Sequence, residues 1–519
     1  MLTKNYASAL CGIEAQIITV EVTTGGVPGV GAIGYHLVGL PDNAVKEGYH
    51  RIQSAIKSIG FRLPRIRIIV NLAPANLRKE GSAFDLPIAL GMMAATGSLN
   101  SDKFPDYVII GELALDGGVR PVRGVLPMAI MAQKKGFKGI FVPKANAQEA
   151  AIVSGLDVYA VENLKEAVSF FNGFDELETV KIESGEHFLT EQHAYSVDFS
   201  DVKGQENIKR ALELAAAGGH NVILIGPPGS GKTMLARRMP SILPPFNLEE
   251  ALETTKIHSI SGLLPDSIGL ISSRPFRSPH HTISDVALVG GGSNPLPGEI
   301  SLAHNGILFL DELPEFKRTV LEVLRQPMEE RKVTISRARM SVDFPAGFML
   351  IASMNPCPCG YYNHPEKECV CAPGIVKKYI NKISGPLLDR IDLHVEVTPV
   401  SYDELSSSRR ANEGSEDIVK RVIDARAIQN KRFQKLKSTH CNAQMPGRMI
   451  REVCSLDDPC KSLLKTAMEK LQLSARAYDR ILKVARTAAD LDSSEEILIA
   501  HLAEAIQYRS LDRDNWVMD

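Results

Sequence analysis

Short apolar runs and helical stretches alternate along the first third of the chain. Runs of alternating or continuous apolar residues predict strands at IITVEV, IRIIVNL, YVIIGEL, GIFVP and LDVYAV. Between these runs, apolar residues recur at helical spacing over Val45–Ile59 and Asp85–Ala95. The pattern predicts an α/β or α+β domain over residues 1–172. The polar, acidic stretch that follows predicts a linker over residues 173–199.

A second α/β pattern occupies residues 200–400. A predicted helix over Asn207–Ala217 leads into a buried strand over Asn221–Ile225. A glycine-rich loop then joins this strand to a helix over Thr233–Met239. Further continuous apolar runs predict two more buried strands, at Ile307–Leu310 and Phe348–Ala352.

Helical periodicity dominates the last part of the chain, residues 401–519. The predicted helices are Glu416–Phe433, Asp458–Leu471, Arg476–Leu491 and Ser494–Gln507. We therefore predict a multidomain α/β protein that ends in a helical domain.

Composition and charge narrow the function classes. Hydrophobic residues make up 44% and charged residues 23% of the 519 residues, as in soluble globular proteins. The chain has no signal-peptide-like start and no apolar run of bilayer length, so we expect a cytoplasmic protein without a membrane partner. The net charge is −2, so any nucleic acid must bind through local basic elements. A single Trp and 6% aromatic residues argue against a broad base-stacking surface.

A phosphate-binding loop follows the strand that ends at Ile225. Its glycines allow the loop to wrap so that backbone N–H groups face phosphates, and the helix behind it adds its positive end. In such a loop the lysine reaches the β- and γ-phosphates of ATP and the threonine hydroxyl binds Mg²⁺. A chance glycine-rich turn is the alternative. The pattern G-x-x-x-x-G-K-(S/T) is fitted by Gly226, Pro227, Pro228, Gly229, Ser230, Gly231, Lys232 and Thr233.

Two carboxylates follow the apolar run ILFL. Ligands of parallel sheets lie at the carboxyl ends of the strands, so Asp311 is predicted to hold Mg²⁺, directly or through water. Glu312 is predicted to orient and polarise the attacking water. The alternative is a strand that happens to end in acidic residues.

Two further polar residues are candidates for the same site. Asn355 ends the predicted strand FMLIASMN and could position the water; the alternative is a turn residue before Pro356. Arg390, just before another strand, could reach the γ-phosphate held by a neighbouring subunit and neutralise developing charge. The alternative for Arg390 is a pairing within its own fold with Asp389 or Asp392.

Arg476 opens a helix of the last domain, where an arginine could sense the nucleotide from a lid. Arg480 and Arg486 lie on the same predicted helix and are the competing candidates for that role.

Four of the eight cysteines form two C-x-C pairs. Clustered cysteines in a reducing compartment indicate a metal before a disulfide, and four thiolates can bind Zn²⁺ tetrahedrally. Free thiols are the alternative, and His364 could replace one sulfur. The predicted ligands are Cys357, Cys359, Cys369 and Cys371.

A basic hairpin is predicted at KVTISRARMSVD, where two alternating stretches flank a short turn. Arg337 and Arg339 lie at this turn and are candidates for phosphate contacts with DNA. A surface hairpin with solvated arginines is the alternative.

The motifs in this order resemble the AAA+ superfamily of ATPases. The stretches RPFRSPHHT, GGGSNPLPGEISLAHNGILFLDELPEF, NPCPCG and SGPLLDRIDLHVEV resemble a narrower group, the magnesium-chelatase-like AAA+ proteins of the YifB/ComM family. This resemblance covers nearly the whole chain. It implies a homo-hexameric ring with Arg390 acting in trans, and an ATP-dependent DNA helicase that promotes branch migration during natural transformation. The basic hairpin is similar to the pre-sensor-1 hairpin of mini-chromosome-maintenance helicases, with Arg337 at their hairpin lysine.

Residues 1–172 resemble the Lon-protease C-terminal domain, which has a ribosomal protein S5 domain 2-like fold. The stretches NLAPANLRKEGSAFDLPIALGMMAA and GELALDGGVRPVRGVLPMA parallel its nucleophile and lysine segments. Ala83 stands at the serine position, beside Ser82, and Leu126 or Met128 stands at the lysine position. Neither Leu nor Met can accept a proton from a serine. The remaining pair is Ser82 with Lys79, so we expect a domain without protease activity that serves for docking or for holding DNA, as in recombination ATPases of the RadA type.

Three functions are consistent with these motifs. The leading prediction is an ATP-dependent DNA motor that uses ATP and Mg²⁺. A magnesium-chelatase motor subunit is the second, although such a subunit has no need of a Lon-like domain. An AAA+ ATPase that remodels proteins is the third.

Overall fold

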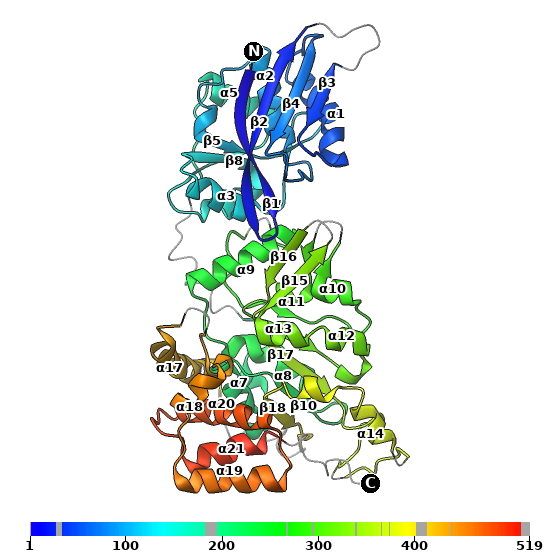
Figure 1. Ribbon diagram of the computed structural model, residues 1–519, viewed down its shortest axis with the longest axis vertical. Helices are drawn as coiled ribbons and strands as arrows, with labels where there is room; N and C mark the ends of the chain where they lie inside the picture. Colours follow the sequence, from blue (N-terminus) through cyan, green and yellow to red (C-terminus); the bar gives the residue numbers. More distant parts are fainter. Residues whose placement is uncertain are drawn as a thin grey trace. The chain divides into compact units, whose positions relative to one another are not determined.

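The computed structural model describes the chain in two compact units. It covers residues 2–26, 34–181, 195–265, 268–292, 295–337, 340–364, 366–372, 374–400, 413–436 and 439–509. The first unit comprises Met1–Thr190, Leu248–Ser272 and Ser336–Asp343, and the second comprises the remaining segments (Figure 1). The segments Leu248–Ser272 and Ser336–Asp343 are thus flanked in sequence by the second unit but belong to the first. The domain boundaries expected from the sequence stay a proposal.

A mixed seven-stranded sheet forms the centre of the first unit. Its spatial order is β3-β4-β2-β1-β5-β8-β9; β2 pairs antiparallel with β1 and β4, and the other neighbours are parallel. The chain start folds as a hairpin in which Leu2 faces Thr23 and Cys11 faces Glu14. The strands are β1 (Leu2–Cys11), β2 (Glu14–Gly25), β3 (Tyr35–Val38), β4 (Arg67–Ala73), β5 (Tyr107–Ile109), β8 (Gly139–Pro143) and β9 (Asp157–Val161).

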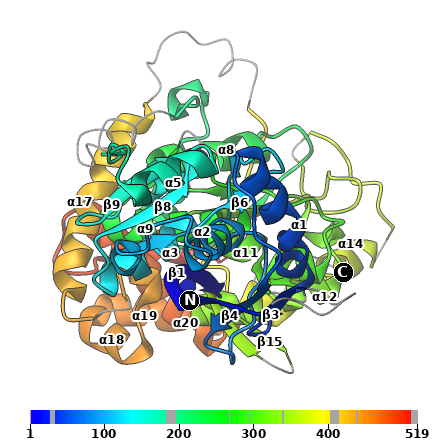
Figure 2. The ribbon, with the colours of Figure 1, turned by 90° about the horizontal axis from the view of Figure 1, so that it is seen from above.

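Helices of the first unit cover the sheet. The helix α2 is buried along its whole length and packs on β1 and β2, and α1 packs against α2 (Figures 1 and 2). The amphipathic α1 begins at an Asp42 cap, whose carboxylate accepts a hydrogen bond from the Val45 N–H. The helices are α1 (Asn43–Ser58), α2 (Asp85–Ala95), α3 (Val125–Lys134), α4 (Ala147–Ala151), α5 (Leu164–Asn172) and α9 (Leu248–Ser261).

The helix α9 joins the first unit through its packing on α3. The Gly124 N–H donates a hydrogen bond of 3.2 Å to the Ser259 carbonyl, and the Ser259 hydroxyl donates to the buried Glu149 carboxylate. Leu252 packs against the apolar cluster that contains Val125. Burial raises the pKa of Glu149, although the hydrogen bonds from Ser259 and the Leu126 N–H oppose that rise.

A five-stranded parallel sheet forms the centre of the second unit, in the order β11-β14-β17-β10-β18. Every residue of β10, β14 and β17 is buried, which accounts for their continuous apolar sequences. The strands are β10 (Val222–Ile225), β11 (Phe276–Arg277), β14 (Ile307–Leu310), β17 (Met349–Met354) and β18 (Leu393–Glu396). The helices next to β10 in sequence are α7 (Glu206–Gly218) and α8 (Lys232–Arg238).

The remaining elements are short helices of the second unit and two-stranded ribbons. The short helices are α10 (Asp285–Val289), α11 (Glu299–Leu302), α12 (Arg318–Glu322), α13 (Arg325–Glu330), α14 (Ile375–Ile380) and α15 (Gly385–Leu388). The two-stranded ribbons are β6 (Glu112–Leu113) with β7 (Val119–Arg120), β12 (Gly290–Gly291) with β13 (Leu296–Pro297), and β15 (Lys332–Arg337) with β16 (Met340–Pro345).

The end of the chain is helical, as predicted, and α17 and α20 pack against α7 (Figure 1). The last helix begins at Ile499, later than the predicted Ser494, because the buried Arg486 guanidinium binds the carbonyl oxygens of Ser494 and Glu495. No helix in the described ranges combines the length and apolar character needed to cross a bilayer. The helices are α17 (Ser415–Phe433), α18 (Gly447–Val453), α19 (Asp458–Lys470), α20 (Ala475–Leu491) and α21 (Ile499–Gln507). The multidomain α/β fold with a helical end is thus confirmed.

Candidate nucleotide-binding site

A pocket of about 470 Å³ lies at the carboxyl ends of β10, β14 and β17. Neighbouring parallel strands end at the same edge of a sheet, so residues far apart in sequence meet there. The pocket brings together the predicted loop, both carboxylates and the predicted Asn355. It is lined by Pro228, Gly229, Ser230, Gly231, Lys232, Thr233, Met234, Asp311, Glu312, Ser353, Met354 and Asn355.

Backbone geometry explains the glycines of the loop after β10. Gly229 and Gly231 have φ angles of 79° and 89°, in the left-handed region that disfavours other residues. A Cβ atom added to Gly226 would lie 2.3 Å from the Val397 carbonyl oxygen, so only glycine fits there. The loop can therefore wrap tightly around a ligand before α8 begins at Lys232.

The Lys232 ammonium is buried and hydrogen-bonded within the pocket. It donates to the Gly226 carbonyl at 2.8 Å, to the Pro227 carbonyl at 2.9 Å and to the Asn355 Oδ1 at 3.2 Å. Burial lowers the pKa of Lys232, while the charges of Asp311 and Glu312 act in the opposite direction. The ammonium thus already has three acceptors, some of which an anionic ligand would replace.

Two hydroxyl groups and one backbone N–H donate to the Asp311 carboxylate in the same pocket. The Thr233 hydroxyl donates to Asp311 Oδ2 at 2.9 Å, and the Ser353 hydroxyl donates to Asp311 Oδ1. The Glu312 N–H also donates to Oδ1, at 3.1 Å. Hard oxygen ligands of this kind suit Mg²⁺. Ser353 was not predicted; its signal is a polar residue in the otherwise apolar strand β17.

Glu312 emerges from the sheet in a left-handed conformation, with φ of 55°. This backbone is unusual for a residue other than glycine, and its side chain is 58% exposed. The His281 Nδ1 lies 3.8 Å from Glu312 Oε2. The carboxylate therefore reaches the open side of the pocket, where a water molecule has access.

Arg390 forms an ion pair with a residue that the sequence did not indicate. Its guanidinium lies 2.7 Å from Glu329 Oε1 and donates to the Pro386 carbonyl at 2.5 Å. This ion pair involves neither Asp389 nor Asp392. Arg390 is absent from the described lining of the pocket.

The three candidate arginines of α20 have different surroundings. Arg480 binds the buried Asp392 at 2.9 Å, and Arg486 binds the buried Asp490 at 3.1 Å, so both have structural partners. Arg476 is 60% exposed and lies 3.4 Å from Asp389. Arg476 is also outside the described pocket lining, but it remains the accessible arginine of the three.

The predicted basic hairpin is present as β15 and β16. Arg339 lies outside the described residues, and the structure describes only the backbone of Arg337, in β15. Their roles in DNA binding stay a prediction.

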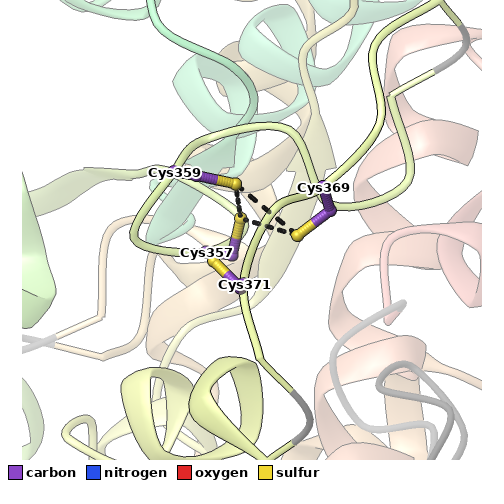
Figure 3. A group of neighbouring side chains, drawn as sticks. All are labelled: Cys357, Cys359, Cys369 and Cys371. Atoms are coloured by element: carbon purple, nitrogen blue, oxygen red, sulfur yellow. Dashed lines mark hydrogen bonds between the residues drawn. The ribbon is translucent and has the colours of Figure 1, made fainter.

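The four clustered cysteines converge from two stretches of one loop, residues 357–359 and 369–371 (Figure 3). Their sulfur atoms all lie within 4.8 Å of one another. His364 is not part of this group, and its Nδ1 accepts hydrogen bonds from the N–H groups of Glu366 and Lys367.

Ser82 and Lys79 of the first unit have separate partners. The Ser82 hydroxyl donates to Glu112, whereas the buried Lys79 ammonium donates to the Pro74 and Leu77 carbonyls. Leu126 lies in the core of this unit. A serine activated by a neighbouring amine requires a direct contact between the hydroxyl and the amine. Here the Ser82 hydroxyl and the Lys79 ammonium are each bonded to other groups.

Family models match three parts of the chain. The model described as "Magnesium chelatase, subunit ChlI" matches residues 198–405. The model "Subunit ChlI of Mg-chelatase" matches residues 20–146, and "Magnesium chelatase, subunit ChlI C-terminal" matches residues 412–509.

Relatives of known name match over nearly the full length. The chain is 44% identical over 515 residues to competence protein ComM of Haemophilus influenzae, covering 98% of this chain and 97% of that protein. It is 44% identical over 510 residues to YifB of Escherichia coli, with the same coverage. Lon protease 2 of Bacillus subtilis is 30% identical over 157 residues, or 28% of this chain and 27% of that protein. The chain therefore belongs to the YifB/ComM family of magnesium-chelatase-like AAA+ proteins.

Proposed function

We propose that this chain is an ATP-hydrolysing motor that moves DNA strands, acting as a homo-hexameric ring that promotes branch migration. One observation carries the ATPase part. The Lys232 ammonium, the Thr233 hydroxyl and the Asp311 carboxylate converge with Asn355 in one pocket, and family membership supports ATP as the ligand.

Each group has a role that its position supports. Lys232 exchanges its carbonyl partners for the β- and γ-phosphates of ATP. Thr233 and Asp311 would hold Mg²⁺, which neutralises part of the phosphate charge when it is bound. Glu312 orients and polarises the attacking water, and Asn355 helps to position it.

Two arginines that do not line the pocket of their own chain also take part in the proposed reaction. Arg390 leaves Glu329 and reaches the γ-phosphate bound by a neighbouring copy, where it offsets charge that develops during phosphoryl transfer. Arg476, exposed on α20, responds to the nucleotide from the helical region.

The DNA part of the proposal rests on the family relationship and on the basic hairpin. The Haemophilus relative is named a competence protein, and competence is the capacity to take up DNA. Arg337 and Arg339 of the basic sequence KVTISRARMSVD can contact phosphates, and hydrolysis would shift this grip along the strand.

The test is a labelled four-way or three-strand DNA junction, incubated with purified protein and ATP and scored for resolved products. The proposal predicts resolution with the wild-type chain and none with Glu312→Gln. ATP turnover is measured in parallel with DNA, with an unfolded protein or with neither. Stimulation by unfolded protein alone would favour a protein-remodelling ATPase. Turnover that DNA does not stimulate, together with intact junctions, would leave a chelatase-type motor as the better explanation.

A further inference from the structure

The four clustered sulfur atoms have the spacing of a metal site. The Cys357 Sγ lies 3.3 Å from Cys359 Sγ and 3.7 Å from Cys369 Sγ. The Cys359 and Cys369 sulfur atoms are 3.5 Å apart. A disulfide would place two sulfurs about 2.0 Å apart. Zn–S bonds of about 2.3 Å in a tetrahedron separate the sulfurs by about 3.8 Å. The arrangement in Figure 3, with Cys371 beside the other three, is close to that tetrahedron.

The ligand set selects the type of metal. Four thiols without carboxylate or imidazole among the described neighbours favour a soft or borderline metal over Mg²⁺ or Ca²⁺. Four protein ligands fill a tetrahedral zinc ion and leave no position for substrate, which is typical of structural sites. Backbone N–H groups of Tyr361 and Val370 also donate to the Cys359 sulfur, which orients it.

The loop that carries the cysteines has little other means of holding its shape. The segment 355–374 contains no helix or strand in its described residues. Among these, only Pro356, Cys357 and Gly360 are buried, and Val370 is 83% exposed. A loop of this length needs an additional source of stability, and a metal that crosslinks both cysteine-containing stretches supplies one.

The same loop contacts the nucleotide pocket. A Cβ atom added to Gly360 would lie 2.5 Å from the Cδ of Pro228, so the cysteine turn packs directly on the phosphate loop. Asn355 lies two residues before Cys357, and its backbone is hydrogen-bonded to the buried Tyr379 hydroxyl. Asn355 thus lies between β17 and the cysteine loop along the chain, and its backbone is bonded to α14, which directly follows that loop.

We propose that Cys357, Cys359, Cys369 and Cys371 bind one structural Zn²⁺ that fixes this loop and thereby holds Pro228 and Asn355 in place at the pocket. The metal site stands independently of the proposed ATPase activity. Only its effect on nucleotide binding rests on the proposed function.

Metal content tests the site without any variant. The full chain, purified without added metal and dialysed against a weak chelator, should carry about one zinc per chain by plasma mass spectrometry. Exchange for Co²⁺ should give the intense sulfur-to-cobalt absorption of a tetrahedral tetrathiolate. Bound iron with visible absorption, disulfides at these cysteines, or freely titrating thiols without metal would each overturn the zinc assignment.

A double variant and a matched control test the ligands and their effect. Cys369→Ser with Cys371→Ser should lose the zinc, whereas Cys11→Ser changes an exposed cysteine outside the cluster and should retain it. We expect the double variant to bind a fluorescent ATP analogue about tenfold more weakly than the control, which corresponds to about 1.4 kcal/mol. Loss of zinc with unchanged affinity would overturn the coupling alone. A wild-type chain that carries zinc but binds no nucleotide would instead overturn the proposed function.

Discussion

The Lys232 ammonium donates a hydrogen bond of 3.2 Å to the Asn355 side-chain oxygen, and this contact joins the phosphate loop to the end of β17. An ammonium group has three N–H donors, and the carbonyls of Gly226 and Pro227 use the other two. The cation is therefore fully bonded before any ligand arrives. A phosphate must replace some of these contacts, which links the position of the loop to the position of Asn355.

We predict that Lys232→Ala nearly abolishes ATP binding. Removing one partner of a buried charge pair costs about 2–5 kcal/mol, so affinity should fall by at least about 30-fold. Isothermal titration with a slowly hydrolysed ATP analogue measures this directly. Lys465→Ala, at an exposed position of α19, is the control and should bind as the wild type does. Equal affinities for both variants would remove Lys232 from the site.

Glu312→Gln should bind ATP with unchanged affinity and hydrolyse it about 10²–10⁴ times more slowly, since an amide cannot act as a general base. Steady-state phosphate release and nucleotide affinity are measured on the same preparation. Glu315→Gln is the matched control, because Glu315 is an exposed carboxylate paired with Lys382 at 3.2 Å. A wild-type rate for Glu312→Gln would disprove its assignment as the base.

The convergence at the pocket could be predicted because each part has a local signature. The runs before Gly226 and Asp311 are continuously apolar, which indicates buried parallel strands, and such strands end at one edge of a sheet. The proximity of Asp311 to the phosphate loop then follows from the neighbouring ends of these strands. The contact of Ser353 with Asp311 could not be predicted in this way, because a single serine in a buried strand is only a weak indication of a site.

Features that depend on distant contacts could not be predicted from the sequence. The helix α9 belongs to the first unit because Ser259 bonds Gly124 and Glu149, far from it in the chain. Arg390 pairs with Glu329 rather than with its sequence neighbours. Local periodicity predicts neither contact, because both join residues that are far apart in sequence and meet only in the folded chain.

The Arg390→Ala variant should assemble with the wild-type chain. Each variant copy should then inactivate the nucleotide pocket of the neighbouring copy that lacks its arginine. If Arg390 acts on a neighbouring copy, mixtures with wild type should lose ATPase activity more steeply than in proportion to the fraction of variant. Assembly is followed by light scattering, and turnover is measured across a series of mixing ratios. Arg448→Ala, at a position 91% exposed, serves as the control. A strictly proportional decline would show that Arg390 acts only within its own chain.

Lys483→Met should stabilise the chain near pH 7 and lose that advantage as pH rises. Burial lowers the pKa of Lys483 to about 8, from an ordinary value of 10.5, and the neighbouring Arg480 charge adds to this effect. The unfolded chain therefore binds the proton more tightly than the folded chain does. Between about pH 8 and 10.5 the free energy of unfolding should rise with pH, and below about pH 8 the full cost of the buried charge is present.

The variant removes this cost but also the hydrogen bond from Lys483 to the Ala443 carbonyl, so we expect a net gain of about 1–2 kcal/mol near pH 7. Denaturant unfolding followed by circular dichroism, repeated from about pH 7 to 10, measures the difference from the wild type. Lys461→Met, at an exposed position of α19, should show no such pH-dependent difference. Two results would contradict this prediction: a Lys483→Met chain that is less stable than the wild type near pH 7, or a stability difference that is constant with pH. Either would show that the buried Lys483 charge does not destabilise the folded chain.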